Sequence, residues 1–318
     1  MKTLAALFFA FAVFAADAQI QSGKPVKLVN PYPPGSSSDV MARLFSSHLS
    51  ASLKTPVIVE NRPGAGGAIG VAAVAQSPAD GHTLLLCNSG PLVIVPLLTK
   101  TPFDPQKDLQ PITQIAYNVM ILVAHAQTAT SLKDLVEQAR AQPGKLTYAS
   151  IGNGSLLHIA GETLKKLAGI DIIHVPYKGT VPAITDVLSR QVTMAFSDLV
   201  ATRPHIEAGT LRALAISGQK RWSAFPNVPL FSEQGYPVLD RFTGWWGVFA
   251  PAGTPPAAVD QLAAAFNEAL RDPTLRKRIS DANAEPTGTS PAEFAEVVRT
   301  DLARWSQLLK ELGNITMD

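Results

Sequence analysis

The chain has 318 residues, of which 16% are charged, and its formal net charge is +2. It contains no basic run that could follow a phosphate backbone, so we expect no nucleic acid partner. Cys87 is the single cysteine. An intramolecular disulfide is therefore excluded, and burial of apolar side chains must hold the fold.

The first 18 residues have the pattern of a secretory signal peptide. They carry Lys2, an apolar run from Leu4 to Ala15 and a small-x-small cleavage site that ends at Ala18. Such a run is shorter than the ~20 residues that span a bilayer, and no later apolar stretch reaches that length. The mature chain would have 300 residues (318 minus 18) and would keep its net charge of +2, because Lys2 and Asp17 leave together. No cysteine that could carry a lipid follows the cleavage site, so we expect a free, monomeric protein in the periplasm.

Three segments repeat the order strand, glycine-rich loop and helix. They are Leu28 to Arg43 (LVNPYPPGSSSDVMAR), Glu60 to Gly70 (ENRPGAGGAIG) and Tyr148 to His158 (YASIGNGSLLH). Each would place backbone N–H groups and the positive end of a helix dipole at the mouth of a loop. Because such helix starts bind anions, the sequence predicts one anion held by several of them.

The first part of the chain alternates strands and helices. Its strands are short and apolar, which is typical of a parallel sheet covered on both faces. The β-rich run from Pro111 to His125 exceeds the usual strand of about 5 to 6 residues, so we expect it to leave one sheet and enter another. The predicted elements of this part are strands Val26–Val29, Val57–Glu60 and Thr83–Cys87 and helices Ser37–Ser52 and Ala68–Gln76.

A second α/β series follows. Ser131 and Asp134 form a capping pattern for its first helix, and Pro143-Gly144 ends that helix. The run Leu211–Ile216 is a candidate return crossing to the first series. The other predicted elements are helices Ser131–Gln142, Ser155–Ala168 and Val181–Ser189 and strands Leu146–Ala149, Ile172–Tyr177 and Val192–Phe196.

The C-terminal part predicts a last buried strand, Gly244–Ala250, and two helices. One helix is capped by Thr254-Pro255-Pro256, and the other follows a capping box formed by Ser290 and Glu293. Two series joined by two crossing β segments predict an α/β fold of two lobes with a cleft and a hinge. We expect residues 19–118 and 221–318 to form the first lobe, covered by the C-terminal helices, and residues 119–220 to form the second.

Motifs of enzymes and cofactor sites are missing from the sequence. A dinucleotide G-x-G-x-x-G run from Gly64 would need glycine where Ile69 stands, and no Walker motif occurs. The six histidines show no metal-ligand spacing, and we find neither a nucleophile elbow nor a triad. We therefore predict no metal and no catalytic residue. Gly64, Gly66 and Gly67 either present N–H groups to an anion or only permit a tight turn and close helix packing.

Four side chains outside these motifs could face a ligand. Asp198 directly follows an apolar strand, where open α/β sheets place ligand groups, but it could equally cap the segment that begins at Leu199. Tyr32 and Tyr177 could flank a ligand from the two lobes or could be buried without function. Lys178 either faces an anion or is solvated.

The chain resembles the Bug family of extracytoplasmic solute receptors, also called TctC-like, which are the substrate-binding proteins of tripartite tricarboxylate transporters. Besides the signal peptide, the matching pieces follow the family's order from residue 30 to residue 255, so the resemblance is specific. These pieces are NPYPPGSSSDVMAR, VENRPGAGGAIG, ADGHTLLL, YASIGNGSLLHIAGE, HVPYKGTVPAITDVLSRQV, LRALAISGQKR, FPNVPLFSEQGYP and WWGVFAPAGTP.

The resemblance implies a periplasmic-binding-protein fold, type II-like, that closes on a small carboxylate without a cofactor and without a reaction, with ordered water often mediating the contact. Two positions depart from the family: Ser36 replaces a usual glycine and adds a hydroxyl that could alter the pocket, and Arg190 stands where glycine is common. The family's ligand contacts map onto Tyr32, Gly35, Ser36, Ala65, Gly66, Gly67, Asn88 and Ser89 in the first lobe and onto Gly152, Ser155, Tyr177 and Asp198 in the second.

We therefore hypothesise an exported receptor that binds a small organic acid or amino-acid-like carboxylate between its lobes and delivers it to the permease subunits of a tripartite transporter. Backbone amides at helix starts would supply most of the hydrogen bonds to the anion. One alternative is a periplasmic lyase or hydrolase that uses Asp198 or His158 as a base. Another is a sensor that presents its closed form to a membrane signalling partner.

Overall fold

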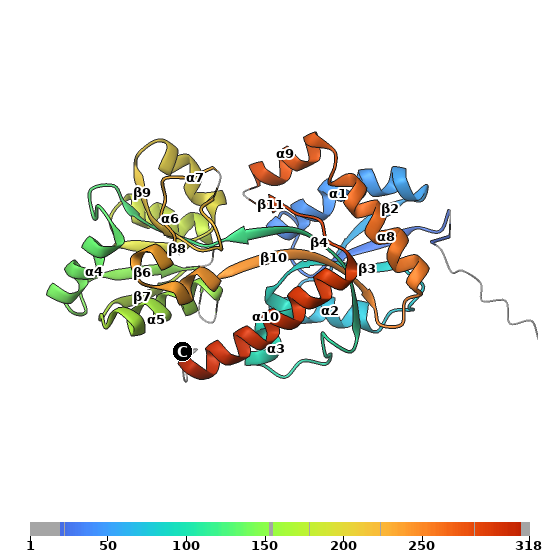
Figure 1. The fold of residues 1–318 in the computed structure, drawn as a ribbon, viewed down its shortest axis with the longest axis horizontal. Coiled ribbons are helices and arrows are strands. Elements are labelled where there is room, and N and C mark those ends of the chain that lie inside the picture. Colours follow the sequence, from blue (N-terminus) through green and yellow to red (C-terminus); the bar gives the residue numbers. More distant parts are fainter. Residues whose placement is uncertain are drawn as a thin grey trace, which may run out of the picture.

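The computed structural model describes residues 20–21, 23–152, 155–177, 179–222, 224–282 and 284–312 (Figure 1). The predicted signal peptide at residues 1–18 lies outside these ranges, and so does Lys178. Within the ranges, the strands form two separate sheets, which lie toward opposite ends of the long axis of the molecule. The predicted α/β class with two sheets is confirmed.

The first sheet combines a parallel part and an antiparallel part. β3, β1 and β2 are neighbours and run parallel, whereas β10 runs antiparallel to β3 and β4, and β11 runs antiparallel to β4. The order across the sheet is β11 (Glu285–Pro286), β4 (Leu109–Val119), β10 (Thr243–Pro251), β3 (Thr83–Asn88), β1 (Val26–Asn30) and β2 (Val57–Asn61).

The second sheet repeats the same division. β7, β6 and β8 are parallel neighbours, and β5 runs antiparallel to both β8 and β9. The order is β7 (Ile173–Pro176), β6 (Thr147–Ser150), β8 (Met194–Ser197), β5 (Ile121–His125) and β9 (Leu211–Ile216). Each sheet therefore contains three adjacent parallel strands whose carboxyl ends share one edge.

The chain passes between the sheets twice. β4 ends at Val119 in the first sheet and β5 begins at Ile121 in the second, so the long β-rich run changes sheets as predicted. The predicted return crossing at Leu211–Ile216 is wrong, because this run is β9 and pairs with β5 at the edge of the second sheet. The return strand is β10, which pairs with β4 over its whole length and runs beside it between the sheets (Figure 1).

The buried side chain of Ser217 joins the two crossings. Its Oγ accepts a hydrogen bond from the backbone N–H of Met120 and donates to the carbonyl of Phe242, both at 2.8 Å. Met120 lies between β4 and β5, and Phe242 directly precedes β10. Ser217 therefore fixes the two connecting segments to each other.

The helices begin largely where the sequence places their caps. Ser131 Oγ accepts from the N–H of Asp134 at 3.1 Å, and Ser290 and Glu293 cap each other's backbone at 2.7 and 3.2 Å. The described helices are α1 (Ser37–Leu53), η1 (Ala65–Gly67), α2 (Ala68–Ala75), η2 (Gly90–Ile94), α3 (Val95–Leu98), α4 (Leu132–Ala141), α5 (Leu156–Ala168), α6 (Thr180–Leu188), α7 (Leu199–Glu207), η3 (Ser232–Gln234), η4 (Pro237–Arg241), α8 (Pro256–Ala269), α9 (Pro273–Asp281) and α10 (Pro291–Leu312).

The C-terminal helices pack mainly on the first sheet. α8 contacts α1 and β4, and α10 contacts β4 and η2. Phe294 of α10 also packs edge-on against Trp245 of β10. α10 also reaches the second sheet's helices, since Lys166 Nζ on α5 donates to the carbonyl of Glu311 at 2.6 Å. In the part of the chain that is described, no helix is both long and apolar enough to cross a membrane.

Candidate functional site

The predicted ligand residues follow the carboxyl ends of the parallel strands in both sheets. In the first sheet, Tyr32 follows β1, the loop from Ala65 to Gly67 follows β2, and Asn88 ends β3. In the second sheet, Gly152, Tyr177 and Asp198 follow β6, β7 and β8. Open α/β sheets bind ligands at such edges, because the loops there converge on one place. We call these two groups the first half-site and the second half-site. The first half-site comprises Tyr32, Gly35, Ser36, Ala65, Gly66, Gly67, Asn88 and Ser89, and the second comprises Gly152, Ser155, Tyr177 and Asp198.

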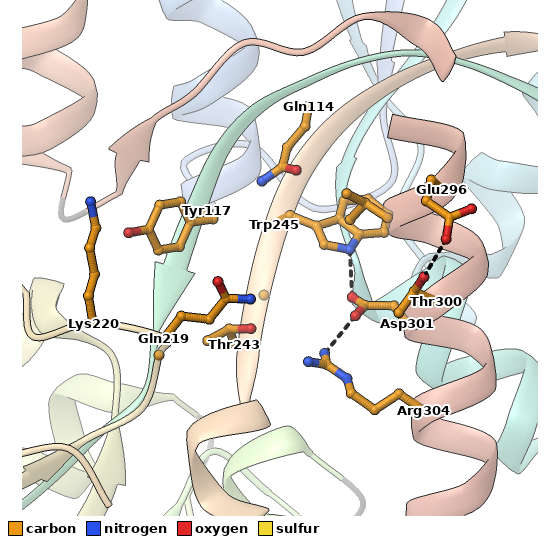
Figure 2. A pocket seen from close by; sticks show the side chains of 13 residues that line it. Gln114, Tyr117, Gln219, Lys220, Thr243, Trp245, Glu296, Thr300, Asp301 and Arg304 are labelled. Atoms are coloured by element: carbon orange, nitrogen blue, oxygen red, sulfur yellow. Dashed lines mark hydrogen bonds and ion pairs between the residues drawn. The ribbon is translucent and has the colours of Figure 1, made fainter. Parts of the chain in front are cut away.

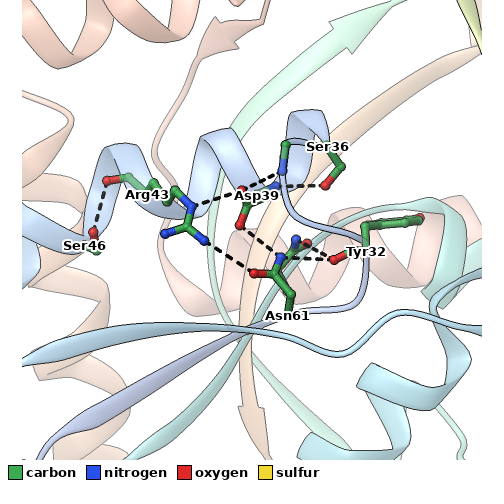
Figure 3. A network of polar contacts seen from close by, with 8 residues as sticks. Tyr32, Ser36, Asp39, Arg43, Ser46 and Asn61 are labelled. Atoms are coloured by element: carbon green, nitrogen blue, oxygen red, sulfur yellow. Dashed lines mark hydrogen bonds and ion pairs between the residues drawn. The ribbon is translucent and has the colours of Figure 1, made fainter.

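The start of α1 is capped by groups of its own chain (Figure 3). Ser36 Oγ accepts from the N–H of Asp39 at 3.2 Å, and the carboxylate of Asp39 accepts from the N–H of Gly35 at 2.9 Å. The hydroxyl that distinguishes Ser36 from the family's usual glycine is therefore a helix cap. The sequence predicted unpaired N–H groups at this helix start, but these two already have internal acceptors.

Asp39 is a fixed anion at this helix start. Its side chain is 4% exposed and accepts from Arg43 Nε at 3.0 Å and from Asn61 Nδ2 at 2.9 Å (Figure 3). Burial by itself raises the pKa of Asp39, but the hydrogen bonds from Arg43, Gly35 and Asn61 hold the pKa below its usual value of 3.8. The carboxylate therefore stays ionised, and the N–H of Gly35 is already bonded to it.

Tyr32 and Asn88 supply polar groups away from Asp39. The hydroxyl of Tyr32 donates to Asn88 Oδ1 at 2.8 Å. Burial raises the pKa of Tyr32 above its usual value, so the hydroxyl is neutral at physiological pH. The amide nitrogen of Asn88 is a donor that this bond leaves in place. The backbone N–H of Ser89 donates to the carbonyl of Trp245 on β10 at 2.9 Å, which ties this loop to the return strand.

The second loop of the first half-site has an unusual backbone. Ala65, Gly66 and Gly67 have φ angles of 49°, 63° and 98°, all in the region that favours glycine. A Cβ atom at Gly67 would lie 2.6 Å from the ring of Pro91. The structural interpretation of these glycines therefore has a physical basis, and their contact with a ligand stays a prediction.

The second half-site is linked by backbone hydrogen bonds. The N–H of Ser155 donates to the carbonyl of Gly152 at 3.2 Å, and the N–H of Tyr177 donates to the carbonyl of Ser150 at 2.9 Å. Ser155 Oγ caps α5 by accepting from the N–H of His158 at 3.2 Å. The hydroxyl of Tyr177 donates to Asp186 at 2.5 Å, and burial followed by this bond raises the pKa of Tyr177 to about 12.

Asp198 has the geometry of a helix cap. Its Oδ1 accepts from the N–H of Ala201 at 3.3 Å, directly before α7. The carboxylate also lies at the carboxyl end of β8 and is partly exposed. The capping interpretation therefore has a hydrogen bond to support it, while the ligand interpretation stays a prediction.

The sequence did not single out three polar residues that end parallel strands. Asn30 ends β1, Ser150 ends β6 and Ser197 ends β8, and all three are buried. Among the residues that the structure describes, Asn30 Oδ1 and Ser197 Oγ are buried polar atoms without a hydrogen-bond partner. Such atoms are rare in folded proteins and mark places where water or a ligand completes the bonding. A polar residue at the end of an apolar strand is the signal that could have identified them.

Two other cavities lie apart from the two half-sites or only at their margin. One of about 650 Å³ lies between β10, α10 and residues 218–220, and Figure 2 shows Trp245 and Arg304 both bonded to Asp301 there. Burial raises the pKa of Asp301 and lowers that of Arg304.

The second of these cavities has a volume of about 780 Å³. It is a largely apolar groove between α2 and α3 that begins at Ala65 and Gly66. Within the described ranges, no group of three or more His, Cys, Asp or Glu residues could hold a metal ion.

Comparison with known proteins finds one family and several close structural relatives. The tripartite tricarboxylate transporter family receptor matches residues 41–314. Protein BugT of Bordetella pertussis is 36% identical over 312 residues, which cover 96% of this chain and 95% of that protein. The protein Rpa4515 of R. palustris, solved with adipate, is 33% identical with a TM-score of 0.79 and covers 91% of this chain and 97% of its own. MatC from Rhodopseudomonas palustris, solved with malate, is 29% identical with a TM-score of 0.75 and covers 89% and 98%. The predicted resemblance and the predicted periplasmic-binding-protein fold are confirmed.

Proposed function

The chain belongs to the family of tripartite tricarboxylate transporter receptors, and on this premise we propose that it captures a small dicarboxylate in the periplasm and delivers it to the membrane subunits of such a transporter. It is a receptor and not an enzyme, as the sequence predicted. In this proposal the chain is exported by its signal peptide and works as a monomer. Residues 19–118 and 221–318 form one lobe, residues 119–220 form the other, and β4 and β10 are the hinge.

The observation that carries the proposal is the matching position of the two half-sites. Each follows the carboxyl ends of three adjacent parallel strands, and each contains hydroxyl and amide groups. Asn30 and Ser197 add a buried polar atom without a partner on each side, counted among the described residues. The relatives solved with adipate and malate support a dicarboxylate as the ligand class.

Neutral donors would bind the anion. The pKa of Tyr32 is raised by burial, so its hydroxyl stays protonated, and the side-chain amide of Asn88 is uncharged at any pH. Hydrogen bonds from such groups to a carboxylate contribute about 1.5 to 3 kcal/mol each. Asp39 keeps its negative charge at the start of α1, so we expect the ligand's carboxylate to lie nearer to Tyr32 and Asn88 than to Gly35.

Closure requires that the ligand touch both half-sites. A ligand with equal affinity for the open and closed forms cannot shift their equilibrium. A dicarboxylate has two anionic ends, so it can meet the loops after β1 and β3 with one end and the loops after β6 and β7 with the other. We therefore expect dicarboxylates to close the protein more completely than monocarboxylates of the same length.

A thermal-shift screen of the mature protein tests the ligand class. Adipate, malate, succinate, acetate and neutral succinamide would be compared at pH 7.5. A ligand at 100 times its dissociation constant raises the free energy of unfolding by about 2.7 kcal/mol. We expect a dicarboxylate to raise the melting temperature and succinamide to leave it unchanged. Stabilisation by none of the acids would contradict the proposed ligand class.

The role of Asp198 is tested by comparing two cap variants. Asp272 also caps a helix, since it accepts from the N–H of Thr274 at the start of α9 at 2.7 Å, and its other oxygen lies 2.8 Å from His48 Nε2. Asp198→Ala and Asp272→Ala should each lower the free energy of unfolding by about 0.5 to 2 kcal/mol. If Asp198 also contacts the ligand, only Asp198→Ala weakens dicarboxylate binding in calorimetry. Equal affinity in the two variants would mean that Asp198 is only a cap.

A further inference from the structure

We propose that Ser150, oriented by His174, is a positioning residue that sets the conformation of the second half-site and thereby its affinity for the ligand. The binding part of this inference rests on the proposed function. The structural part does not, since it concerns the loop itself. The sequence did not predict a role in binding for Ser150 or His174.

Ser150 is the hub of the second half-site. Its side chain is fully buried, and its Oγ lies 3.1 Å from the nitrogen and 3.2 Å from the carbonyl oxygen of Gly152. The same Gly152 carbonyl accepts from the N–H of Ser155, and the carbonyl of Ser150 accepts from the N–H of Tyr177. One buried serine is therefore linked, directly or through one bond, to three of the four residues in the second half-site.

His174 restrains the hydroxyl of Ser150. The two residues lie on neighbouring parallel strands, and His174 Nε2 is 2.7 Å from Ser150 Oγ. A hydroxyl has one proton and two lone pairs. It can donate to the carbonyl of Gly152 and accept from the N–H of Gly152, which leaves one lone pair. All three contacts are satisfied together when His174 Nε2 carries a proton and donates to that lone pair.

The ring of His174 is held between two other rings. It stacks on Tyr148 with centroids 4.9 Å apart and on His158 with centroids 4.1 Å apart. Tyr148 is anchored in turn, since its hydroxyl donates to Glu162 Oε1 at 2.7 Å. The ring of His174 therefore has little freedom to turn away from Ser150.

The surroundings of the two stacked histidines favour their neutral forms. Burial lowers the pKa of His158, and burial together with the adjacent His158 lowers the pKa of His174 to about 4. The charged groups of α5 that act on the rings are Glu162 and Lys165, which pair at 3.2 Å. The strands beside the stack contribute Tyr148 and Ser150. The helix η4 that packs against α5 carries Asp240 and Arg241. At neutral pH both imidazoles are uncharged, so His174 acts through its geometry and not through charge.

This arrangement makes the loop conformation depend on one buried hydroxyl. Without the Oγ of Ser150, the N–H of Gly152 loses its acceptor in the described structure, and the peptide planes around Gly152 are free to turn. Gly152 has a φ of 121°, a region in which glycine moves easily between conformations. Ser150 therefore selects one conformation of a loop that its glycine alone would leave variable.

The test uses four variants of the mature protein at pH 7.5. Ser150→Ala removes the Oγ that bonds Gly152, and His174→Phe keeps the stacked ring but removes the Nε2 donor. His174→Gln keeps a side-chain N–H that can reach Ser150. Thr163→Val is the matched control, because it also deletes a buried hydroxyl. This hydroxyl lies within α5, where it donates to the carbonyl of Ile159 at 2.7 Å and has no bond to the described part of the loop at Gly152.

Two readouts separate this inference from the proposed function. The first is the exchange rate of the Gly152 amide hydrogen in the ligand-free protein, measured by NMR. The second is the dissociation constant of adipate, measured by calorimetry. We expect Ser150→Ala and His174→Phe to speed the exchange and to weaken adipate binding by about tenfold each, because each variant loses one buried hydrogen bond that holds the loop; tenfold corresponds to about 1.4 kcal/mol. His174→Gln should restore both quantities to within about threefold of the wild type, and Thr163→Val should change neither, because its lost bond is remote from the loop.

Unchanged exchange at Gly152 in both Ser150→Ala and His174→Phe would overturn the inference, whatever adipate does. Faster exchange with an unchanged adipate constant would also overturn it, because the loop would then not control affinity. If the wild type binds no adipate, the proposed ligand class fails on its own. In that case the exchange rates still decide the structural part, since faster exchange in the two variants and recovery in His174→Gln support it.

Discussion

The two half-sites share a topology but are held together by different chemistry. In the first, a buried ionised carboxylate, Asp39, collects donors from Gly35, Arg43 and Asn61. In the second, a buried hydroxyl, Ser150, is bonded to Gly152 and restrained by the neutral ring of His174. The same edge of a parallel sheet can therefore be organised by a charge or by an uncharged network, and the choice decides how each half responds to pH.

The positions of the fixed charges indicate how the two halves divide the work of binding. Beside the first half-site, Asp39 forms an ion pair with Arg43 and already accepts from the Gly35 amide, so we expect an anion there to be bound by groups that point away from Asp39. The described network around Ser150 and His174 carries no charge at neutral pH. Since the second half-site has a carboxylate of its own at Asp198, we infer that a ligand carboxylate there lies nearer to Gly152 than to Asp198.

The largest expected effect concerns the loop from Ala65 to Gly67 in the first half-site. Gly67→Ala places a methyl group against Pro91 at a residue whose φ is 98°. We expect the free energy of unfolding to fall by about 2 to 4 kcal/mol, because backbone strain and overpacking add. Gly235→Ala is the control, since Gly235 has a φ of 90° but open space around it. It should cost only about 1 kcal/mol in chemical denaturation, and equal losses would show that no close packing holds the loop.

The pH dependence of stability should separate the two halves. The pKa of His174 is about 4 in the folded protein and 6.5 ordinarily. As pH falls from 6.5 to 4, the unfolded chain binds a proton that the folded chain does not, so stability is lost in this window by at most about 3 kcal/mol. The lowered pKa of Asp39 acts in the same direction but in a more acidic window: its stabilisation is present above 3.8 and is lost as pH falls below that value.

The measurement is urea denaturation of the wild type and of His174→Gln between pH 7.5 and 4. We expect the wild type to lose more stability than the variant in this range and the two curves to run parallel above pH 7. Identical slopes across the whole range would show that His174 is not a source of acid sensitivity.

A smaller contrast is expected between the two tyrosines, of which each half-site contains one. Tyr32→Phe removes the bond to Asn88 at a buried hydroxyl and should cost about 1 to 2 kcal/mol of stability. Tyr177→Phe removes the bond to Asp186, which is partly exposed, and should cost less than about 1 kcal/mol. Thermal unfolding of both variants gives the comparison. A larger loss for Tyr177→Phe than for Tyr32→Phe would contradict the expected order.

The smallest effect is expected outside both half-sites. Arg190 has a φ of 62°, which explains why glycine is common at this position in the family. Arg190→Gly should raise the free energy of unfolding by about 0.5 kcal/mol, because relief of strain slightly exceeds the added entropy of the unfolded chain. Chemical denaturation and adipate calorimetry would be measured together, and any change in affinity would mean that this turn communicates with the ligand.

The sequence predicted the parallel strands and the loops after them because short apolar runs followed by glycine are local signals. It placed the return crossing at Leu211–Ile216 because both this run and β10 are apolar, and only the pairing with β4 distinguishes them. The carboxylate at position 39 was visible, but its capture of the Gly35 amide depends on Asn61, 22 residues away. The bond between Ser150 and His174 spans 24 residues and depends on strand order, which no local pattern encodes.

The most direct test of the account is a crystal structure of the mature protein with the dicarboxylate that stabilises it most. The account predicts one carboxylate within hydrogen-bonding distance of Tyr32 or Asn88 and the other within reach of the loops at Gly152 and Tyr177. A ligand bound by one sheet alone, or bound in the cavity between β10 and α10, would contradict it.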